Sequence, residues 1–230
     1  MLSRWRFFLL SVLAIGFAAA HAPALAAKEA LAEWKKVDED NGVTIFEMKE
    51  RSGLLAFRTE GTVDAPVLHV ASVLLDAEHT PDWVDHLEED KVIRSMGPGQ
   101  FLEYTHVGTP FVLKDRDFLC EVTIQLNETD KVLVIESHSV EDASIPLTKY
   151  VRGNVVHNEF RLSPDSSPGK TKLMGEFHID PKGTVPRWMV NLFQRAWPKK
   201  AFRAIQKRVA EFNPAVPKAL ESVQAALARF

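Results

Sequence analysis

The strongest constraint on this fold is a bulky apolar face in the last third of the chain. Gly183-Thr184-Val185-Pro186 is typical of a helix start, with Thr184 suited to capping exposed amides and Pro186 to the first turn. Large apolar side chains then recur at three- and four-residue intervals, at Trp188, Met189, Leu192, Phe193 and Trp197. Pro198 predicts a kink, beyond which the spacing resumes as far as Phe212. Such a helix needs a large apolar surface to cover.

The middle of the chain supplies that surface as a run of predicted β-strands. Short turns separate segments rich in β-branched and aromatic residues, which is typical of an antiparallel meander. The predicted strands are 43–48, 54–63, 91–96, 101–107, 118–127, 132–140, 151–162 and 172–180. Further helices are predicted at 28–36, at 67–75, at 81–84 and, as an amphipathic tail, at 218–230.

Residues 1–26 have the order of a secretory signal. Arg4 and Arg6 precede an apolar run over 7–20, and small residues follow at Ala24 and Ala26. The run is shorter than the ~20 residues that a membrane-spanning helix needs, so cleavage after Ala26 is favoured over retention as an anchor. We therefore expect a periplasmic or secreted protein.

The length and composition of the chain limit the number of domains and the kinds of partner that we expect. We expect one ligand-binding domain over 27–213 and a C-terminal tail over 214–230. With 28 basic and 31 acidic residues, the chain lacks the positive charge that nucleic-acid binding requires. Cys120 is the single cysteine and cannot form an internal disulfide, so we interpret it as a buried strand thiol.

Three local strings, in this order along the chain, resemble one known family. They are Pro81-Asp82-Trp83-Val84, then Lys114-Asp115-Arg116-Asp117-Phe118, which follows a loop containing Pro110, and finally the segment 180–191 with its Pro186 and Trp188. Together they span about 28–212, and they are similar to segments of the START family of lipid-transfer domains.

The resemblance implies an α+β helix-grip fold, in which a curved antiparallel sheet wraps a long C-terminal helix around an internal hydrophobic tunnel. Members of this family hold one lipid or sterol in the tunnel. Methionine and aromatic side chains suit such adaptable apolar pockets. The expected ligand-binding residues are Phe111, Leu113, Arg116, Met174, Phe177, Trp188, Met189, Leu192 and Phe193. Sterol-binding relatives carry an inner acid and arginine where this chain is expected to have Thr105 and Val122, a departure that leaves the ligand class open.

Two alternatives concern individual features of this site. The apolar helix face could instead fill a closed core. Arg116 could either meet a ligand headgroup at the tunnel mouth or tie a loop to backbone carbonyls or to a carboxylate. For the moving part that admits a ligand, the candidates are the loop at Ile145-Pro146-Leu147 and the kink at Pro198.

The sequence predicts binding rather than catalysis, with no catalytic residue, no cofactor and no metal site. Acids near His79 and His86 lack a close pair of histidine ligands, and no Gly-x-Ser-x-Gly nucleophile motif occurs. The expected partner is a hydrophobic small molecule or lipid, bound by a monomer that contacts membranes transiently. One alternative is an enzyme of the same fold, a cyclase or hydrolase on an apolar substrate, which requires a cavity-facing acid or histidine with a perturbed pKa. Another is a protein-interaction module with a collapsed tunnel.

Overall fold

One large sheet organises the protein. The computed structural model describes residues 33–50, 52–109 and 113–229, and residues 32–230 form a unit distinct from residues 1–31, so the predicted signal lies outside the described residues. The strands are β1 (Lys35–Asp40), β2 (Val43–Lys49), β3 (Leu55–Val63), β4 (Leu87–Gly97), β5 (Gln100–Val107), β6 (Arg116–Asn127), β7 (Val132–Ser139), β8 (Val151–Arg152), β9 (Asn154–Pro164) and β10 (Thr171–Asp180).

The sheet joins a meander that ends at β10 to the three N-terminal strands. It runs β1-β2-β3-β10-β9-β7-β6-β5-β4, so β10 returns to pair with β3. Every pair on this path is antiparallel, while the two-residue β8 pairs with β6 in parallel. The predicted antiparallel meander is therefore confirmed.

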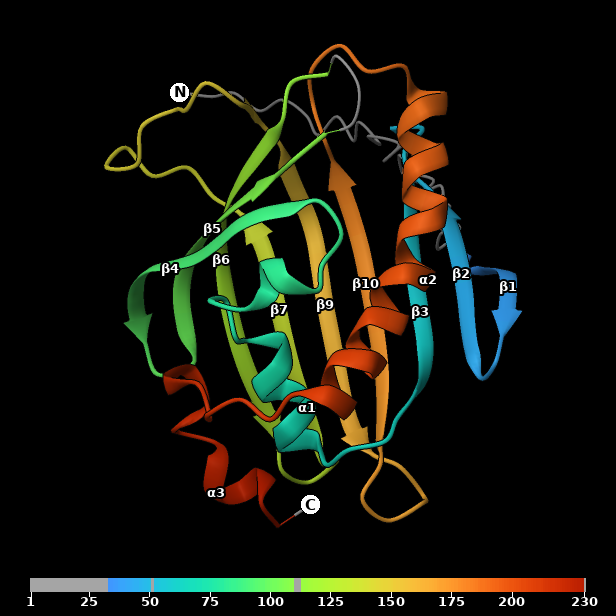
Figure 1. Cartoon of the computed structure of the whole chain (residues 1–230), viewed down its shortest axis with the longest axis vertical. Helices are drawn as coiled ribbons and strands as arrows, with labels where there is room; N and C mark the ends of the chain where they lie inside the picture. Colours follow the sequence, from blue (N-terminus) through green and yellow to red (C-terminus); the bar gives the residue numbers. More distant parts are fainter. Residues whose placement is uncertain (1–32, 51, 110–112, 230) are drawn as a thin grey trace, which may run out of the picture. The chain divides into compact units, whose positions relative to one another are not determined.

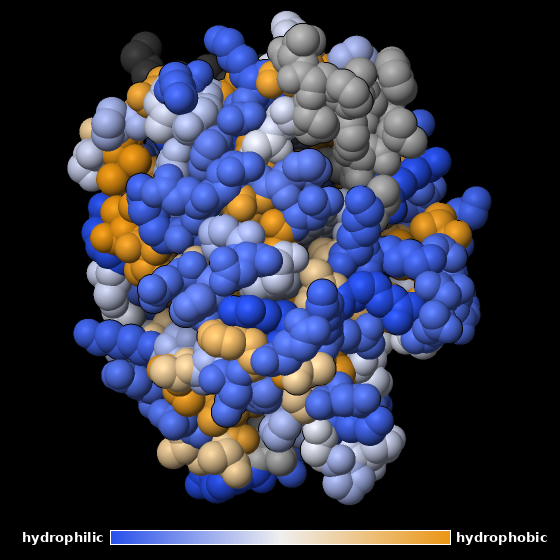
Figure 2. Space-filling model, viewed as in Figure 1, coloured by the Kyte–Doolittle hydropathy of each residue, from blue (hydrophilic) through white to orange (hydrophobic). Residues whose placement is uncertain are grey.

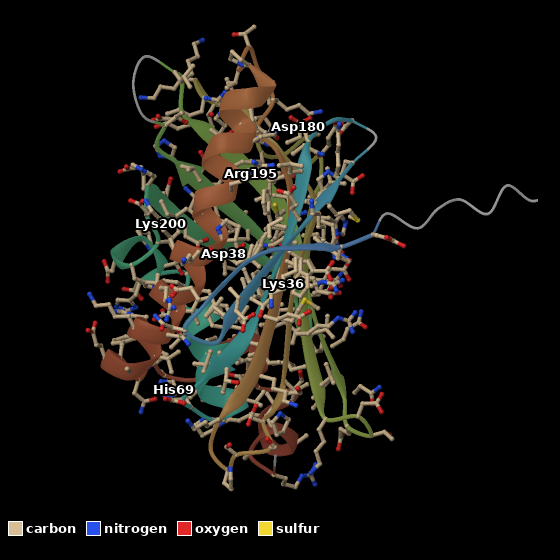
Figure 3. All side chains as sticks on the ribbon, turned by 90° about the vertical axis from the view of Figure 1, so that its right-hand side faces the viewer. Lys36, Asp38, His69, Asp180, Arg195 and Lys200 are labelled. Atoms are coloured by element: carbon tan, nitrogen blue, oxygen red, sulfur yellow. The ribbon has the colours of Figure 1, made fainter. Side chains whose placement is uncertain are left out.

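The helices lie on one face of this sheet. They are α1 (Val67–Leu74), η1 (Thr80–Asp82), α2 (Arg187–Glu211), η2 (Lys218–Leu220) and α3 (Gln224–Leu227). Figure 1 shows α1 and α2 in front of the sheet, with the β1–β2 hairpin beside α2. Lys199 of α2 forms an ion pair of 3.1 Å with Asp38 of β1, which is labelled in Figure 3, and this pair joins the helix to the hairpin. The predicted α+β helix-grip fold is confirmed.

The second half of α2 packs tightly on the sheet. Phe202, Ile205 and Val209 are buried against a core that includes α1 and the inner residues of β6, β7, β9 and β10. Gly61 on β3 permits this approach, because a Cβ atom there would lie 2.7 Å from the Phe202 ring. Pro198 lies inside α2, which changes direction partway along its length (Figure 1), as expected where a proline removes a helix hydrogen bond.

Several local predictions were wrong in detail. Thr184 does not cap α2, which begins at Arg187 after Pro186 without a side-chain cap. The predicted strand 151–162 is divided at Gly153, where a Cβ atom would lie 2.2 Å from the Phe118 ring. Lys35 begins a strand instead of ending the predicted helix 28–36, of which residues 28–32 lie outside the described residues.

The C-terminal tail also differs from the single helix expected at 218–230. It forms the short η2 and α3 instead, and these place Leu220 and Leu227 in the main core. The tail therefore contributes apolar side chains to the folded unit.

Most large apolar side chains face inward. The face drawn in Figure 2 is mainly hydrophilic, with hydrophobic residues in separate small patches. Leu147 is the most exposed of the large hydrophobic residues in the described chain, at 79%. In the same part of the chain, no helix has the length and apolar character needed to span a membrane.

Candidate functional site

An apolar cavity of about 440 Å³ lies between the sheet and the first half of α2. This volume falls within the roughly 300–1,000 Å³ that is typical of small-molecule sites. Most of its lining is carbon, contributed by Phe57, Val84, Leu87, Val107, Leu113, Phe118, Phe177, Ile179, Pro181, Val185, Val190, Trp197 and Pro198. The cavity can therefore hold hydrocarbon in contact with protein carbon.

Strand pairing and ring packing build the wall. Phe177 on β10 pairs directly with Phe57 on β3, so both rings project toward α2. Trp197 of α2 meets Phe177 edge to face, with ring centroids 4.7 Å apart at 88°. This contact places the kinked helix directly on the cavity wall. Phe118 of β6 also lines the cavity, and its ring occupies the space left by the absent side chain of Gly153.

A few polar residues also line the cavity. Asp85 and Lys200 lie 3.5 Å apart and are both more than half exposed, so this ion pair contributes little stability. Lys200, labelled in Figure 3, extends from α2. His86 has a left-handed backbone with φ of 64°, and its carbonyl accepts a hydrogen bond of 2.8 Å from the Gly108 amide. That bond joins two segments of the rim.

Arg116 enters the same wall at the start of β6. It is 6% exposed, and its guanidinium donates to the carbonyls of Lys114, Pro181 (3.2 Å) and Lys182 (3.3 Å). Burial lowers the pKa of Arg116, with a smaller opposing effect from Asp115. The structure thus supports the reading in which Arg116 ties loops to β6. Arg116 also lines the cavity, so its contact with a ligand stays a prediction.

Asp115 fixes the loop that precedes β6. Its carboxylate accepts hydrogen bonds from the Thr109 amide at 2.9 Å and from His106 at 3.1 Å, and these bonds hold the pKa of Asp115 below its usual range. His106 in turn stacks on Tyr150, with ring centroids 4.0 Å apart. This network anchors both ends of the segment that carries Phe111.

The structure brings three of the predicted site residues together. Leu113, Arg116 and Phe177 all line the cavity. Met174 does not, because on β10 it alternates with the inward-facing Leu173 and Gly175 and pairs with the outward-facing Arg161 and Glu60. The remaining predictions lie outside the described residues, either entirely or in their side chains: Phe111, Trp188, Met189, Leu192 and Phe193.

Other lining residues were missed by the sequence analysis. Phe57, Val107 and Ile179 come from strands whose inward-facing positions depend on register, and 84–86 come from an irregular segment ahead of β4. Val190 was available from the sequence, since it lies within the predicted helix. Its small size among bulkier neighbours gave no reason to select it.

One of the two proposed gates does not line the cavity. Ile145 packs with Leu102, Tyr104 and Leu119 on the face of the sheet opposite the cavity. Pro198, in contrast, is buried and forms part of the lining. The kink in α2 therefore remains the candidate for a moving part.

The acids around His79 and His86 do not assemble into a metal site in the described chain. His79 pairs with Asp76 at 2.9 Å, and this hydrogen bond raises the pKa of His79. Over 33–50, 52–109 and 113–229, no three potential ligands lie close enough together to hold an ion.

A meandering sheet closed by a long helix over an apolar cavity defines the helix-grip class of proteins. A model of the START domain matches residues 15–213, which is most of the chain. The protein therefore belongs to the START domain family.

Individual relatives agree with this assignment. An uncharacterized protein of Pseudomonas aeruginosa is 25% identical over 170 residues, covering 73% of this chain and 82% of the relative. Human StAR-related lipid transfer protein 5 superposes with a TM-score of 0.71 at 24% identity, over 80% of this chain and 89% of that one. A STAR-related lipid transfer protein from Xanthomonas axonopodis gives 0.68 at 20% identity, over 77% and 98% of the two chains. The two structures share the fold of this protein.

Proposed function

We propose that this protein binds a hydrophobic molecule, such as a lipid or fatty acyl compound, in the cavity between α2 and the sheet and carries it through water. The observation that carries the proposal is the cavity itself, about 440 Å³ lined almost entirely by carbon. START lipid transfer proteins share its fold. We further propose that the carrier acts as a periplasmic or secreted monomer with transient membrane contact.

The physical driving force is the transfer of hydrocarbon out of water. Each buried methylene contributes ~0.8 kcal/mol, so a chain of about ten carbons supplies several kcal/mol before the costs of association are subtracted. The ligand also needs a route in and out. The segment of α2 around Pro198 meets this need, because a helix lacking one internal hydrogen bond bends there at low cost.

An enzyme of the same fold is the weaker candidate. Asp90 and Glu103 are inward-facing acids, and burial raises the pKa of both, but neither lines the cavity. Their described neighbours include Thr80 and Cys120. Burial raises the pKa of the Cys120 thiol to about 12, so it stays protonated and is a poor nucleophile. These surroundings favour binding over covalent chemistry.

Titration with a fluorescent fatty acyl probe tests the binding function. We expect saturable binding of one probe per protein, accompanied by a change in tryptophan emission, because Trp197 lines the cavity. Unlabelled fatty acids and alcohols should displace the probe, with affinity that rises with chain length. Probe signal that increases without saturation, or that ignores unlabelled competitor, would contradict internal binding.

A further inference from the structure

Arg116 is a buried cation in the wall of the mainly apolar cavity. It is 6% exposed and begins β6, where it pairs with Val107 of β5. Val107, Phe118 and Pro181 line the cavity beside it, and Phe118 lies two residues farther along the same face of β6. A full positive charge therefore lies among carbon atoms, at the boundary of the space that a ligand would occupy.

The two acids that flank Arg116 in the sequence are both bound to other residues. Asp115 accepts a hydrogen bond of 3.1 Å from His106. Asp117 binds Arg152 behind the sheet, at 3.0 and 3.1 Å. In the part of the chain that the structure describes, the hydrogen bonds of the Arg116 guanidinium all go to backbone carbonyls, and the effect of Asp115 on its pKa is smaller than that of burial. Arg116 thus lacks a carboxylate partner among the described residues.

The guanidinium also has hydrogen-bond donors to spare. Its Nε atom donates to the carbonyl of Pro181 at 3.2 Å, and its two terminal nitrogens donate to the carbonyls of Lys182, at 3.3 Å, and of Lys114. Because a guanidinium carries five N–H groups, these three bonds leave one N–H on each terminal nitrogen without an acceptor among the described residues. Buried polar groups are normally paired, so two acceptor positions beside Arg116 remain to be filled.

The three carbonyls hold the guanidinium in place without neutralising it. Lys114 precedes β6, and Pro181 and Lys182 follow β10, so two separate loops fix the position of the Arg116 side chain. A donor that is already ordered loses little conformational entropy when a ligand binds. A buried ion without a counter-charge, in contrast, remains costly. Both properties favour a ligand that brings a negative charge to this position.

We propose that Arg116 binds the carboxylate of a fatty acid whose hydrocarbon chain occupies the cavity. A carboxylate supplies the missing negative charge and two acceptor oxygens, and pairs of arginine with carboxylate are frequently bidentate. A hydroxyl brings no charge, and an ammonium would be repelled. This inference rests on the proposed binding function and adds a preference for one class of headgroup.

Lys200 is the other cation of the cavity lining that can compete for this role. It already lies 3.5 Å from Asp85, and its side chain is 66% exposed. Water and Asp85 therefore stabilise its charge without a ligand, and an exposed pair of this kind contributes little. Arg116 is the cation whose surroundings leave the charge uncompensated.

Competition among three ligands of equal chain length tests the preference. Decanoic acid, decanol and decylamine are each used to displace the fluorescent acyl probe from the full chain near neutral pH. We expect decanoate to bind about tenfold more tightly than decanol, and decylamine to bind most weakly. In Arg116→Gln, which removes the charge, the ratio of decanoate to decanol affinity should fall to about one.

The ionisation of the bound acid gives a second readout on the wild type. Decanoic acid labelled with carbon-13 at the carboxyl carbon reports its own protonation state by its chemical shift. An apolar cavity alone would raise the pKa of the bound carboxyl, whereas a guanidinium partner lowers it. We therefore expect the bound acid to be fully ionised at about pH 6, and a protonated bound acid at that pH would overturn the site.

A matched control separates Arg116 from general surface charge. Arg195 of α2, labelled in Figure 3, pairs with Glu47 of β2 at 3.1 Å; its side chain is 60% exposed and does not line the cavity. Arg195→Gln removes the same charge and should keep the wild-type ratio of decanoate to decanol affinity. Circular dichroism and thermal midpoints establish that each variant is folded.

Because Arg116 also ties two loops to β6, Arg116→Gln is expected to lower the thermal midpoint. If this variant fails to fold, a crystal structure of the wild type with decanoate decides. A carboxylate within hydrogen-bond distance of the guanidinium supports the site, and a carboxylate bound elsewhere overturns it.

The competition separates failure of the site from failure of the carrier function. Equal or tighter binding of decanol or decylamine to the wild type would overturn the carboxylate site while leaving the carrier function intact. A ratio that persists in folded Arg116→Gln would place the preference elsewhere and also overturn the site. If none of the three ligands displaces the probe, the carrier function itself fails, and the carboxylate site fails with it.

Discussion

Replacing Asp117 by alanine is expected to lower the free energy of unfolding by about 3–5 kcal/mol, the usual cost of removing one partner from a buried ion pair. Asp117 is 0% exposed and accepts hydrogen bonds from Arg152 at 3.0 and 3.1 Å and from Thr148 at 2.8 Å. The variant leaves both donors unpaired and releases the segment that joins β7 to β8. Urea-induced unfolding followed by circular dichroism measures the loss.

An exposed ion pair provides the control for this variant. Glu128 and Arg229 lie 3.3 Å apart with side chains 66% and 70% exposed, so Glu128→Ala should cost less than about 1 kcal/mol. A loss of this small size in Asp117→Ala would contradict the structural role assigned to the buried pair.

The same carboxylate makes the stability dependent on pH. Burial alone would raise the pKa of Asp117, but the hydrogen bonds from Arg152 and Thr148 outweigh burial and lower it. Because the folded pKa lies below the unfolded value of about 3.9, this contribution is present above that pH and is lost as the pH falls through the folded pKa. Asp117→Ala should therefore lose less of its stability than the wild type on acidification below about pH 4.

Val190→Trp is expected to reduce ligand affinity by at least about tenfold, equivalent to ~1.4 kcal/mol. Val190 is 7% exposed on α2 and lines the cavity, so an indole there occupies space that a ligand would use. Displacement of the fluorescent acyl probe gives the affinity. Thermal unfolding of the same sample shows whether the helix still packs.

Val156→Trp is the matched control for the cavity-filling variant. Val156 is 46% exposed and does not contribute to the cavity, so the same substitution there should leave probe affinity within about twofold of the wild type. If Val190→Trp remains folded and binds the probe as well as Val156→Trp does, ligands bind somewhere other than this cavity.

Much of the fold was predictable because its signals are local. Turn residues separate the strands, and the apolar spacing that begins at Trp188 resumes beyond Pro198 as far as Phe212. The strand β1 was missed because its sequence, Lys-Lys-Val-Asp-Glu-Asp, is almost wholly charged and lies at an edge of the sheet. Without an apolar face, such a strand has no alternating pattern to detect.

The site was less predictable because it depends on which face each strand residue occupies. Arg116 and Asp117 looked like one unit in the sequence, yet as neighbours on β6 they project to opposite faces. Arg116 reaches the cavity and nearby backbone carbonyls, while Asp117 binds Arg152 behind the sheet. The same alternation of faces along a strand places Phe177 in the cavity and Met174 on the opposite face of the sheet.

The inward-facing acids Asp90 and Glu103 illustrate what strand pairing adds to the sequence. Glu103 was not selected from the sequence, since a lone acid on a predicted strand is usually solvated. Register aligns Glu103 with Cys120 and brings it near Asp90, more than ten residues earlier on a neighbouring strand. Only the paired sheet shows that these acids share an interior without a counter-charge among the described residues.

The central claim is that a hydrophobic guest occupies the cavity, and mass spectrometry of organic extracts from the purified protein tests it most directly. Wild-type protein and Val190→Trp are purified in parallel from the same host and extracted. The account predicts an apolar compound that copurifies with the wild type in near-equal molar amount and is depleted in the variant. Wild-type protein that yields no such compound, or equal yields from both proteins, would contradict it.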